Sequence, residues 1–144
     1  MFVYSVKFIC GTQNVPSTAP NICTPVRQGV YATEINIHNF QATAATIQKR
    51  ALLLVHNDQA VREPAIARAQ PFANITLPPD TATMDDCCSL QGPLNLSLTQ
   101  LNIGFLEILS NVALNVTAVY TATDSKAPPA SISIDVQSIA PQQV

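Results

Sequence analysis

The sequence predicts an all-β fold, a β-sandwich or jelly roll of about seven to eight strands. Two patterns predict it: short runs in which apolar and polar residues alternate, and clusters of Pro, Asn, Ser and Gly that separate these runs. The length of 144 residues fits one domain, so we expect a single β-sandwich domain over residues 1–144.

The first alternating run is Val3–Cys10. Because side chains alternate between the two faces of a strand, one face of this run carries a large apolar set that we expect in the core. That set is Tyr4, Val6, Phe8 and Cys10. Gly11–Arg27 follows with three Pro and several small polar residues, which predicts a long loop.

The next two runs also alternate. Gly29–Asn39 predicts a strand whose faces differ: Tyr31, Thr33, Ile35 and Ile37 lie on one face, and Ala32, Glu34, Asn36 and His38 lie on the other. Thr43–His56 predicts another strand, with Ile47, Lys49, Ala51, Leu53 and Val55 on one face. A helix is the alternative for this second run, because many of its residues tolerate helix, but the neighbouring strands favour a strand.

The middle of the chain is punctuated by Pro. Asn57–Pro71 predicts a polar loop, Phe72–Leu77 a short strand, and the Pro-Pro-Asp sequence that follows predicts a sharp turn. We expect Thr81–Asp85 to continue as a strand and Asp86–Leu90 to form a helical turn. Gln91–Pro93 should then end that turn, because Gly and Pro disfavour helix.

The last third of the chain holds the best hairpin candidate. Leu101–Leu109 and Ala113–Ala122 both alternate, and the polar pair Ser110-Asn111 lies between them. Thr123–Ala130 predicts a Pro-containing loop, and Ser131–Ile139 predicts the strand that completes the sheet.

The composition excludes some partners and favours others. Charged residues make up 11% of the chain, where about 25% is usual, so the surface must be rich in uncharged polar residues, Ala and Pro. Such a surface is easily desolvated by another protein, and a net charge of −2 gives little repulsion between copies. Seven Lys and Arg without a basic stripe argue against nucleic acid, and no apolar run is long enough for membrane insertion.

The N-terminal segment Met1–Cys10 lacks a basic start and a long apolar region, so we interpret it as a strand and not as a signal peptide. The cysteines suit an oxidising setting, so we favour an extracellular or cell-surface location over a cytoplasmic one.

Four cysteines are candidates for disulfides or for contacts between subunits: Cys10, Cys23, Cys87 and Cys88. No CxxC pair is present, so a four-cysteine zinc site is not predicted. The adjacent Cys87 and Cys88 bridge each other only in a strained ring. Bonds to Cys10 or Cys23, bonds between chains, and reduced buried thiols remain open alternatives.

Two polar groups are candidate binding sites. Glu34, Asn36 and His38 point the same way along one strand and could line a ligand-binding face, although such a stripe is more often solvated or covered by a subunit. Asp80, Asp85 and Asp86 could bind a cation through oxygen ligands, but no alternating calcium loop is present. The simpler interpretation is that these carboxylates order a turn and cap a helical turn, so we predict no metal and no cofactor.

Motifs for catalysis are missing from the sequence. Nucleophilic catalysis needs a nucleophile, a base and an orienting group, and the chain has two His and no GxSxG, HExxH or phosphate-binding glycine loop. We therefore expect that the protein is not an enzyme; a metal-dependent enzyme is the weakest alternative.

Several segments resemble a family of small bacterial proteins of uncharacterised function. The resembling segments are YSVKFICG (4–11), GVYATEINIHN (29–39), LPPDTATMDDC (77–87), GFLEI (104–108), LNVTAVYT (114–121) and IDV (134–136). The resemblance touches most of the chain and implies a β-sandwich, but no activity. The predicted architecture is also similar to that of small β-sandwich subunits of pili, spore appendages and capsids, by analogy of fold only.

The sequence thus favours a structural subunit that forms homo-oligomers, with an extracellular fibre or appendage as the assembly. In this hypothesis Met1–Tyr4 or Ala140–Val144 lies across a neighbouring copy as an added strand. The alternative is a binding module for a small ligand, a carbohydrate or a partner protein.

Overall fold

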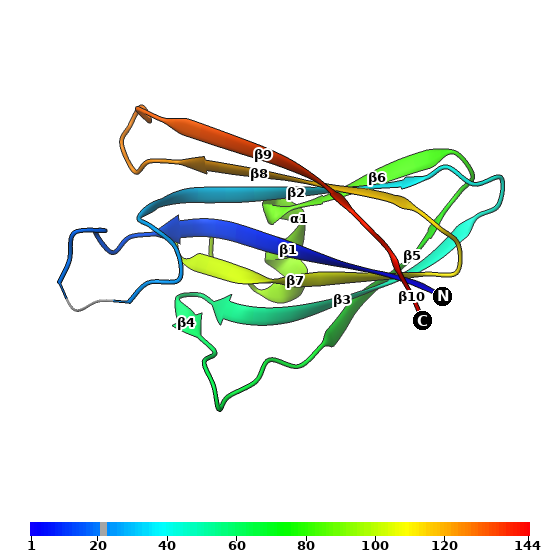
Figure 1. Ribbon diagram of the computed structural model, residues 1–144, viewed down its shortest axis with the longest axis horizontal. Coiled ribbons are helices and arrows are strands. Elements are labelled where there is room, and N and C mark those ends of the chain that lie inside the picture. The colour runs from blue at the N-terminus through cyan, green and yellow to red at the C-terminus, as the bar shows by residue number, and fades with distance from the viewer. Residues whose placement is uncertain (21–22) are drawn as a thin grey trace.

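The structure is a computed structural model that describes residues 1–20 and 23–144 (Figure 1). The strands in this part are β1 (Phe2–Gln13), β2 (Gly29–Asn39), β3 (Ala45–His56), β4 (Gln59–Ala60), β5 (Gln70–Leu77), β6 (Thr81–Asp86), β7 (Leu101–Ser110), β8 (Asn115–Thr123), β9 (Ile132–Ile139) and β10 (Gln142–Gln143). One helix, α1 (Cys87–Leu94), lies between β6 and β7. Of the ten described strands, eight have six residues or more, and the all-β prediction is confirmed.

The strands form one open antiparallel sheet in the order β4–β3–β7–β1–β2–β8–β9, with β5 paired to β3 and β6 paired to β2. β2 pairs with β1 only through Gly29–Tyr31, and its later residues pair with β6 instead. The sheet therefore divides into two layers, β5–β3–β7–β1 and β6–β2–β8–β9, which gives a sandwich-like fold. In Figure 1, β2, β8 and β9 lie on one side of β1, and β7 and β3 lie on the other.

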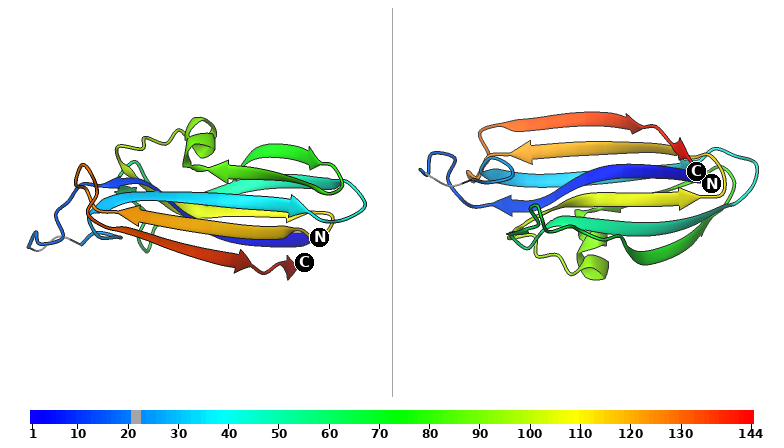
Figure 2. Two further views of the ribbon diagram at one scale, coloured as in Figure 1. Left: turned by 90° about the horizontal axis from the view of Figure 1, so that it is seen from above. Right: turned by 60° about the horizontal axis from the view of Figure 1, so that its bottom comes forward.

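The core lies between these layers and is built from the apolar faces of the alternating strands. All four predicted core residues of β1 are fully buried, as are Ile35 and Ile37 of β2. Leu90 and Leu94 of α1 pack into the same cluster. Figure 2 (left) shows α1 on the opposite side of the molecule from β9. The strand over Ala45–His56 is confirmed against its helical alternative, because β3 pairs with both β5 and β7.

The predicted hairpin is wrong. β7 pairs with β1 and β3, whereas β8 pairs with β2 and β9, so consecutive strands lie in different layers. Asn111 does not begin a tight turn: its N–H donates to the Thr46 carbonyl, and its side-chain oxygen accepts from the Thr46 N–H at 2.8 Å. Because Asn111 extends the pairing with β3, the chain crosses the core before β8 begins.

The predicted end of the helical turn at Gln91–Pro93 is also wrong, since α1 continues through Pro93 to Leu94. Asp86 and Ser89 form a capping box at its start, and Asn95 ends it with φ 53°. Pro93 lies in the last turn of α1. Because Pro has no backbone N–H, the helix loses a single hydrogen bond there.

The two chain ends pair with each other instead of extending away from the fold. β10 pairs with the first residues of β1 at Phe2 and Val3, and the Val144 N–H donates to the Met1 carbonyl. In this structure the tail Ala140–Val144 therefore lies on its own chain. Neither end is a free strand of the kind that addition to a neighbouring copy requires.

Candidate functional site

The two layers expose very different outer surfaces, and the predicted ligand stripe lies on the layer β6–β2–β8–β9. Directly paired residues in an antiparallel sheet lie on the same face. Because Ala118 is buried in the core, its pairs Ile35 and Gln137 share the inner face. The residues between them therefore form the outer face, which we define by Glu34, Asn36 and His38 of β2, Met84 of β6, Asn115, Thr117 and Val119 of β8, and Ile132, Ile134 and Val136 of β9.

The stripe Glu34, Asn36 and His38 does lie together on this outer face and is half-buried. Its neighbours are Met84 and Thr117, which pair with Asn36 from either side, and Asn115, which pairs with His38. A shallow depression of about 320 Å³ is lined by Asn36 and His38 of the stripe together with Met84, Asn115 and Thr117, but not by Glu34. Amide, hydroxyl and imidazole groups gather there, and such groups can exchange hydrogen bonds with a polar ligand.

The acidic residues of the neighbouring segment do not form one cluster. Asp80 lies in the turn after β5 with φ 50°, and its Oδ1 is 3.3 Å from His38 Nε2. Asp86 accepts the Ser89 N–H at 2.8 Å and caps α1. Asp85 points into the core, with its Oδ2 2.7 Å from Lys49 Nζ. Within residues 1–20 and 23–144, no group of three or more His, Cys, Asp or Glu is placed to hold a metal ion.

The Lys49–Asp85 ion pair joins the two layers through the interior. The two side chains are only 6% and 11% exposed, and they come from β3 and β6. A buried pair of this kind adds little net stability over apolar residues, but removal of one partner leaves an uncompensated buried charge. Any arrangement of β6 and β3 that separates Lys49 from Asp85 would leave both charges buried and unpaired, so the ion pair disfavours such arrangements.

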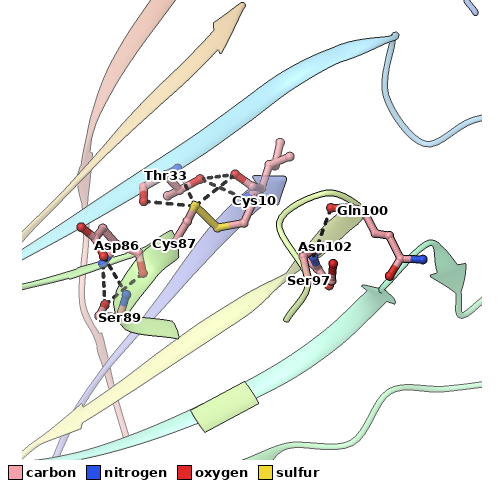
Figure 3. Close-up of a disulfide and its surroundings, with 9 residues drawn as sticks. Cys10, Thr33, Asp86, Cys87, Ser89, Ser97, Gln100 and Asn102 are labelled. Atoms are coloured by element: carbon pink, nitrogen blue, oxygen red, sulfur yellow. Dashed lines mark hydrogen bonds between the residues drawn. A yellow bond between two sulfur atoms is a disulfide. The ribbon is translucent and has the colours of Figure 1, made fainter. Parts of the chain in front are cut away.

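The cysteines divide into a bonded pair and two exposed thiols. Cys10 of β1 is bonded to Cys87, the first residue of α1, with their Cα atoms 5.6 Å apart. The bond lies beside Thr33 of β2 (Figure 3). The Thr33 hydroxyl donates to the Ile9 carbonyl and accepts the Ile9 N–H. This cluster joins β1, β2 and α1 at the place where the sheet divides. Cys23 and Cys88 are free and exposed, so they remain available for contacts between copies.

A second depression, which the sequence did not predict, lies on the outer side of the other layer. Its volume is about 340 Å³, and Ile9, Ile103 and Val26 form an apolar floor beside the cationic Lys7 and Arg62. These residues come from two strands and two loops far apart in the sequence. No local motif signals such a site, because only the tertiary structure brings the loop residues over β1 and β7.

The tyrosine hydroxyl between the two layers has a perturbed acidity. Tyr120 of β8 donates to the Lys7 carbonyl of β1 at 2.7 Å. Burial raises the pKa of Tyr120, and the negative charge of Asp135 on β9 raises it further. The hydroxyl therefore stays protonated and keeps its donor role across the physiological pH range.

The strand β9 carries the clearest unpartnered surface. Its apolar residues Ile132, Ile134 and Val136 are 73%, 68% and 61% exposed. They lie on the outer face, because Val136 pairs with Val119 and Ile134 with Thr121, whereas the core-facing Ala118 pairs with Gln137. The apolar side of β9 therefore points away from the core of its own chain.

Comparisons with known proteins give a fold-level likeness and no assignment of function. No family model matches the chain, and no curated protein sequence matches it. These results agree with a resemblance to a family of uncharacterised function. The fold is similar to the crystal structure of Thermotoga maritima 1070, with 13% identity over 93% of this chain and 91% of that chain and a TM-score of 0.46. A likeness of this size carries no conclusion about what the chain does.

No helix among the described residues is long and apolar enough to cross a membrane.

Proposed function

We propose that this chain is a structural subunit that associates with copies of itself through protein–protein contacts, as a component of an extracellular fibre or appendage. The observation that carries the proposal is the apolar row of β9, which is directed into solvent and away from the core. Exposed apolar side chains that form a contiguous group are typical of interaction sites. Ile132, Ile134 and Val136 form such a group on the outer face of β9.

The charge-poor surface supports the same proposal. With 11% charged residues and a net charge of −2, neither long-range repulsion nor strong desolvation of ionic groups opposes contact between copies. The Cys10–Cys87 disulfide supports the extracellular part, because structural disulfides persist in oxidising environments. The exposed Cys23 and Cys88 add a means of covalent linkage between copies in such an environment.

The test is the native mass of the protein over a range of concentrations, measured by light scattering and negative-stain microscopy with and without reductant. We expect species larger than the monomer, whose mass grows with concentration. Partial loss of the larger species under reductant would place Cys23 or Cys88 between copies, and Cys23→Ser/Cys88→Ser should then reproduce that loss. A monomer at every concentration in both conditions would overturn the proposal.

A second candidate function is a binding module for a small ligand or a carbohydrate, and the depression over Asn36, His38 and Thr117 favours it. A panel of monosaccharides is titrated against the protein while backbone NMR shifts are followed. Saturable shifts confined to this depression, and lost in His38→Ala, would support binding. Shifts that do not saturate, or that are unchanged in His38→Ala, would remove the site.

A further inference from the structure

We infer that two copies of this chain pair through β9, strand against antiparallel strand, in a register centred on Ile134. This inference rests on the proposed self-association and names the contact that produces it. The starting point is the free edge: β9 is the last strand of the sheet order, and Figure 2 (right) shows it at the margin of the sheet. Its pairing with β8 runs without a register shift from Ile132 to Ile139, so its backbone is regular along the whole edge.

Sheet edges are normally protected against pairing, and β9 has less of this protection than β4 or β5. Common devices are charged side chains on the edge, Lys above all, Pro within the strand, a bulge, or a very short strand. The edge strand β5 has Pro71 and a bulge opposite Lys49 and Arg50, and β4 has two residues. By contrast, β9 has eight residues with no Lys, Arg or Pro, and its one charged residue is Asp135. Compared with β4 and β5, β9 is therefore the edge better suited to receive another strand.

The residue pattern of β9 is complementary to itself, which identifies a second copy as the occupant. When two β9 strands run antiparallel with Ile134 opposite Ile134 of the second copy, Ile132 lies opposite Val136 and Val136 opposite Ile132. All three outer-face pairs are then apolar, and such cross-strand pairs stabilise sheets. On the other face Ser133 lies opposite Asp135, so a hydroxyl donor meets a carboxylate acceptor.

The neighbouring registers are worse for stated reasons. A register centred on Asp135 places that carboxylate directly opposite its own copy, and like charges in that position are destabilising. A register centred on Val136 places Ile134 opposite the polar Ser138, which leaves a single apolar pair on the outer face. Compared with these two registers, the one centred on Ile134 has more apolar pairs on the outer face and no pair of like charges.

The loop before β9 limits the length of the pairing. The Asp124 carboxylate accepts hydrogen bonds from the N–H groups of Ala130 and Ser131 at 2.9 and 3.0 Å, so these amides are already occupied. The pairing therefore spans Ile132–Val136 in each copy. A typical stable interface uses about 20–30 residues a side, so we expect weak, concentration-dependent association from this contact alone.

The symmetry of the contact determines the product. The same residues are used on both copies, so the contact is isologous and closes into a dimer with a two-fold axis. The two layers β6–β2–β8–β9 then become one continuous sheet across the dimer. A fibre would be built from such dimers through a different contact.

Cysteine cross-linking tests the register. In a Cys23→Ser/Cys88→Ser background, Ile134→Cys places a thiol opposite itself in the dimer. Opposite Cβ atoms lie about 4.5–5.5 Å apart, close to the roughly 3.5–4.5 Å that a disulfide requires. With oxidised glutathione we expect Ile134→Cys to give a covalent dimer on a non-reducing gel. Ile132→Cys and Val136→Cys should each stay monomeric alone and cross-link when the two proteins are mixed.

The outcomes separate this inference from the proposed function. If the background protein is oligomeric by light scattering but Ile134→Cys cross-links no better than the matched edge variant Ser138→Cys, the β9 pairing is wrong while self-association stands. Equal cross-linking by Ile132→Cys, Ile134→Cys and Val136→Cys would mean that the outer faces touch without this register, and would also overturn the pairing. A background protein that is monomeric throughout would overturn the β9 pairing, and a parent protein that is monomeric throughout would overturn both proposals.

Discussion

β1 and β9 are both strands with alternating side chains, yet they end in opposite environments. In β1 the apolar face of Tyr4, Val6 and Phe8 is completely buried. In β9 the apolar face of Ile132, Ile134 and Val136 is largely exposed and lies on the outer side of the sheet. β1 lies inside the sheet order with β7 and β2 beside it, whereas β9 is at the end.

The difference shows what alternation does and does not determine. Alternation gives a strand two chemically distinct faces, because successive side chains point to opposite sides. Which of these faces meets the core depends on the register with the neighbouring strand, and a shift of one residue exchanges them. In β9 the register with β8 places Gln137, not an apolar residue, next to the buried Ala118.

The largest effect should come from the core face of β1. Phe8→Ala removes a fully buried ring, so we expect a loss of about 3–5 kcal/mol in the free energy of unfolding. Ile134→Ala, the matched change on β9, should alter stability by less than about 0.5 kcal/mol. Urea denaturation at low protein concentration measures both. Equal losses for the two variants would mean that β9 is packed against its own chain.

The disulfide is the second difference, since it anchors β1, whereas β9 contains no cysteine. Cys10→Ala/Cys87→Ala opens a link between residues 77 apart in sequence, and we expect a loss of about 2–5 kcal/mol. Cys23→Ser/Cys88→Ser changes exposed thiols and should leave thermal unfolding within about 0.5 kcal/mol of the parent. Destabilisation by the second pair instead of the first would contradict the assigned bond.

A smaller loss should follow from the Tyr4 hydroxyl, which joins β1 to the start of β8. It donates to the Leu114 carbonyl at 2.9 Å and accepts the Leu114 N–H at 2.7 Å. Tyr4→Phe leaves both buried backbone groups without this partner, at a cost of about 1–3 kcal/mol. The control is Tyr31→Phe, whose exposed hydroxyl bonds the Arg27 carbonyl and is replaceable by water. Chemical denaturation that ranks Tyr31→Phe as the more damaging change would disprove this account.

The smallest effect concerns the loop that leads into β9. Partial desolvation alone would raise the pKa of Asp124, but hydrogen bonds from the N–H groups of Lys126, Ala130 and Ser131 and from the Ser131 hydroxyl outweigh it and lower the pKa. Since the folded-state pKa is depressed, the stabilisation is present above the ordinary value of 3.8 and is lost as pH falls through the folded-state pKa.

Amide hydrogen exchange measures this loop directly. The Ala130 and Ser131 amides should lose protection in acid, and Asp124→Asn should weaken their protection at neutral pH as well. Asp135→Asn, on the adjacent strand, should leave these two amides unchanged. Protection that is the same in Asp124→Asn and the parent would show that the carboxylate does not order the entry into β9.

Much of the fold was predictable because its signals are local. The Gly29–Asn39 strand and the buried face of β1 were predicted correctly, since alternation and turn residues act over a few positions. The β7–β8 hairpin was not, because two alternating runs joined by a polar segment look the same whether the chain turns back or crosses to the other layer. Asn111 shows the difference only through its bonds to Thr46.

The candidate sites were predictable to a lesser degree. The spacing of Glu34, Asn36 and His38 placed them on one face, as the structure has them, but the depression on that face is lined by Asn36 and His38 without Glu34. The structure separates the three acidic residues: Asp80 lies in a turn, Asp85 in the core and Asp86 at a helix cap. The turn and cap roles were predicted. The buried ion pair of Asp85 with Lys49 was not predicted. The depression beside Lys7 and Arg62 had no sequence signal at all.

By itself the sequence determined the strand-rich class, the charge-poor surface and the two-faced character of its main strands, because these follow from composition and a two-residue period. The tertiary structure alone decided that Cys10 bonds Cys87, that β7 and β8 lie in different layers, and that the apolar side of β9 points outward. Each of these depends on which distant segments pack together, and packing of residues far apart in the chain leaves no local pattern.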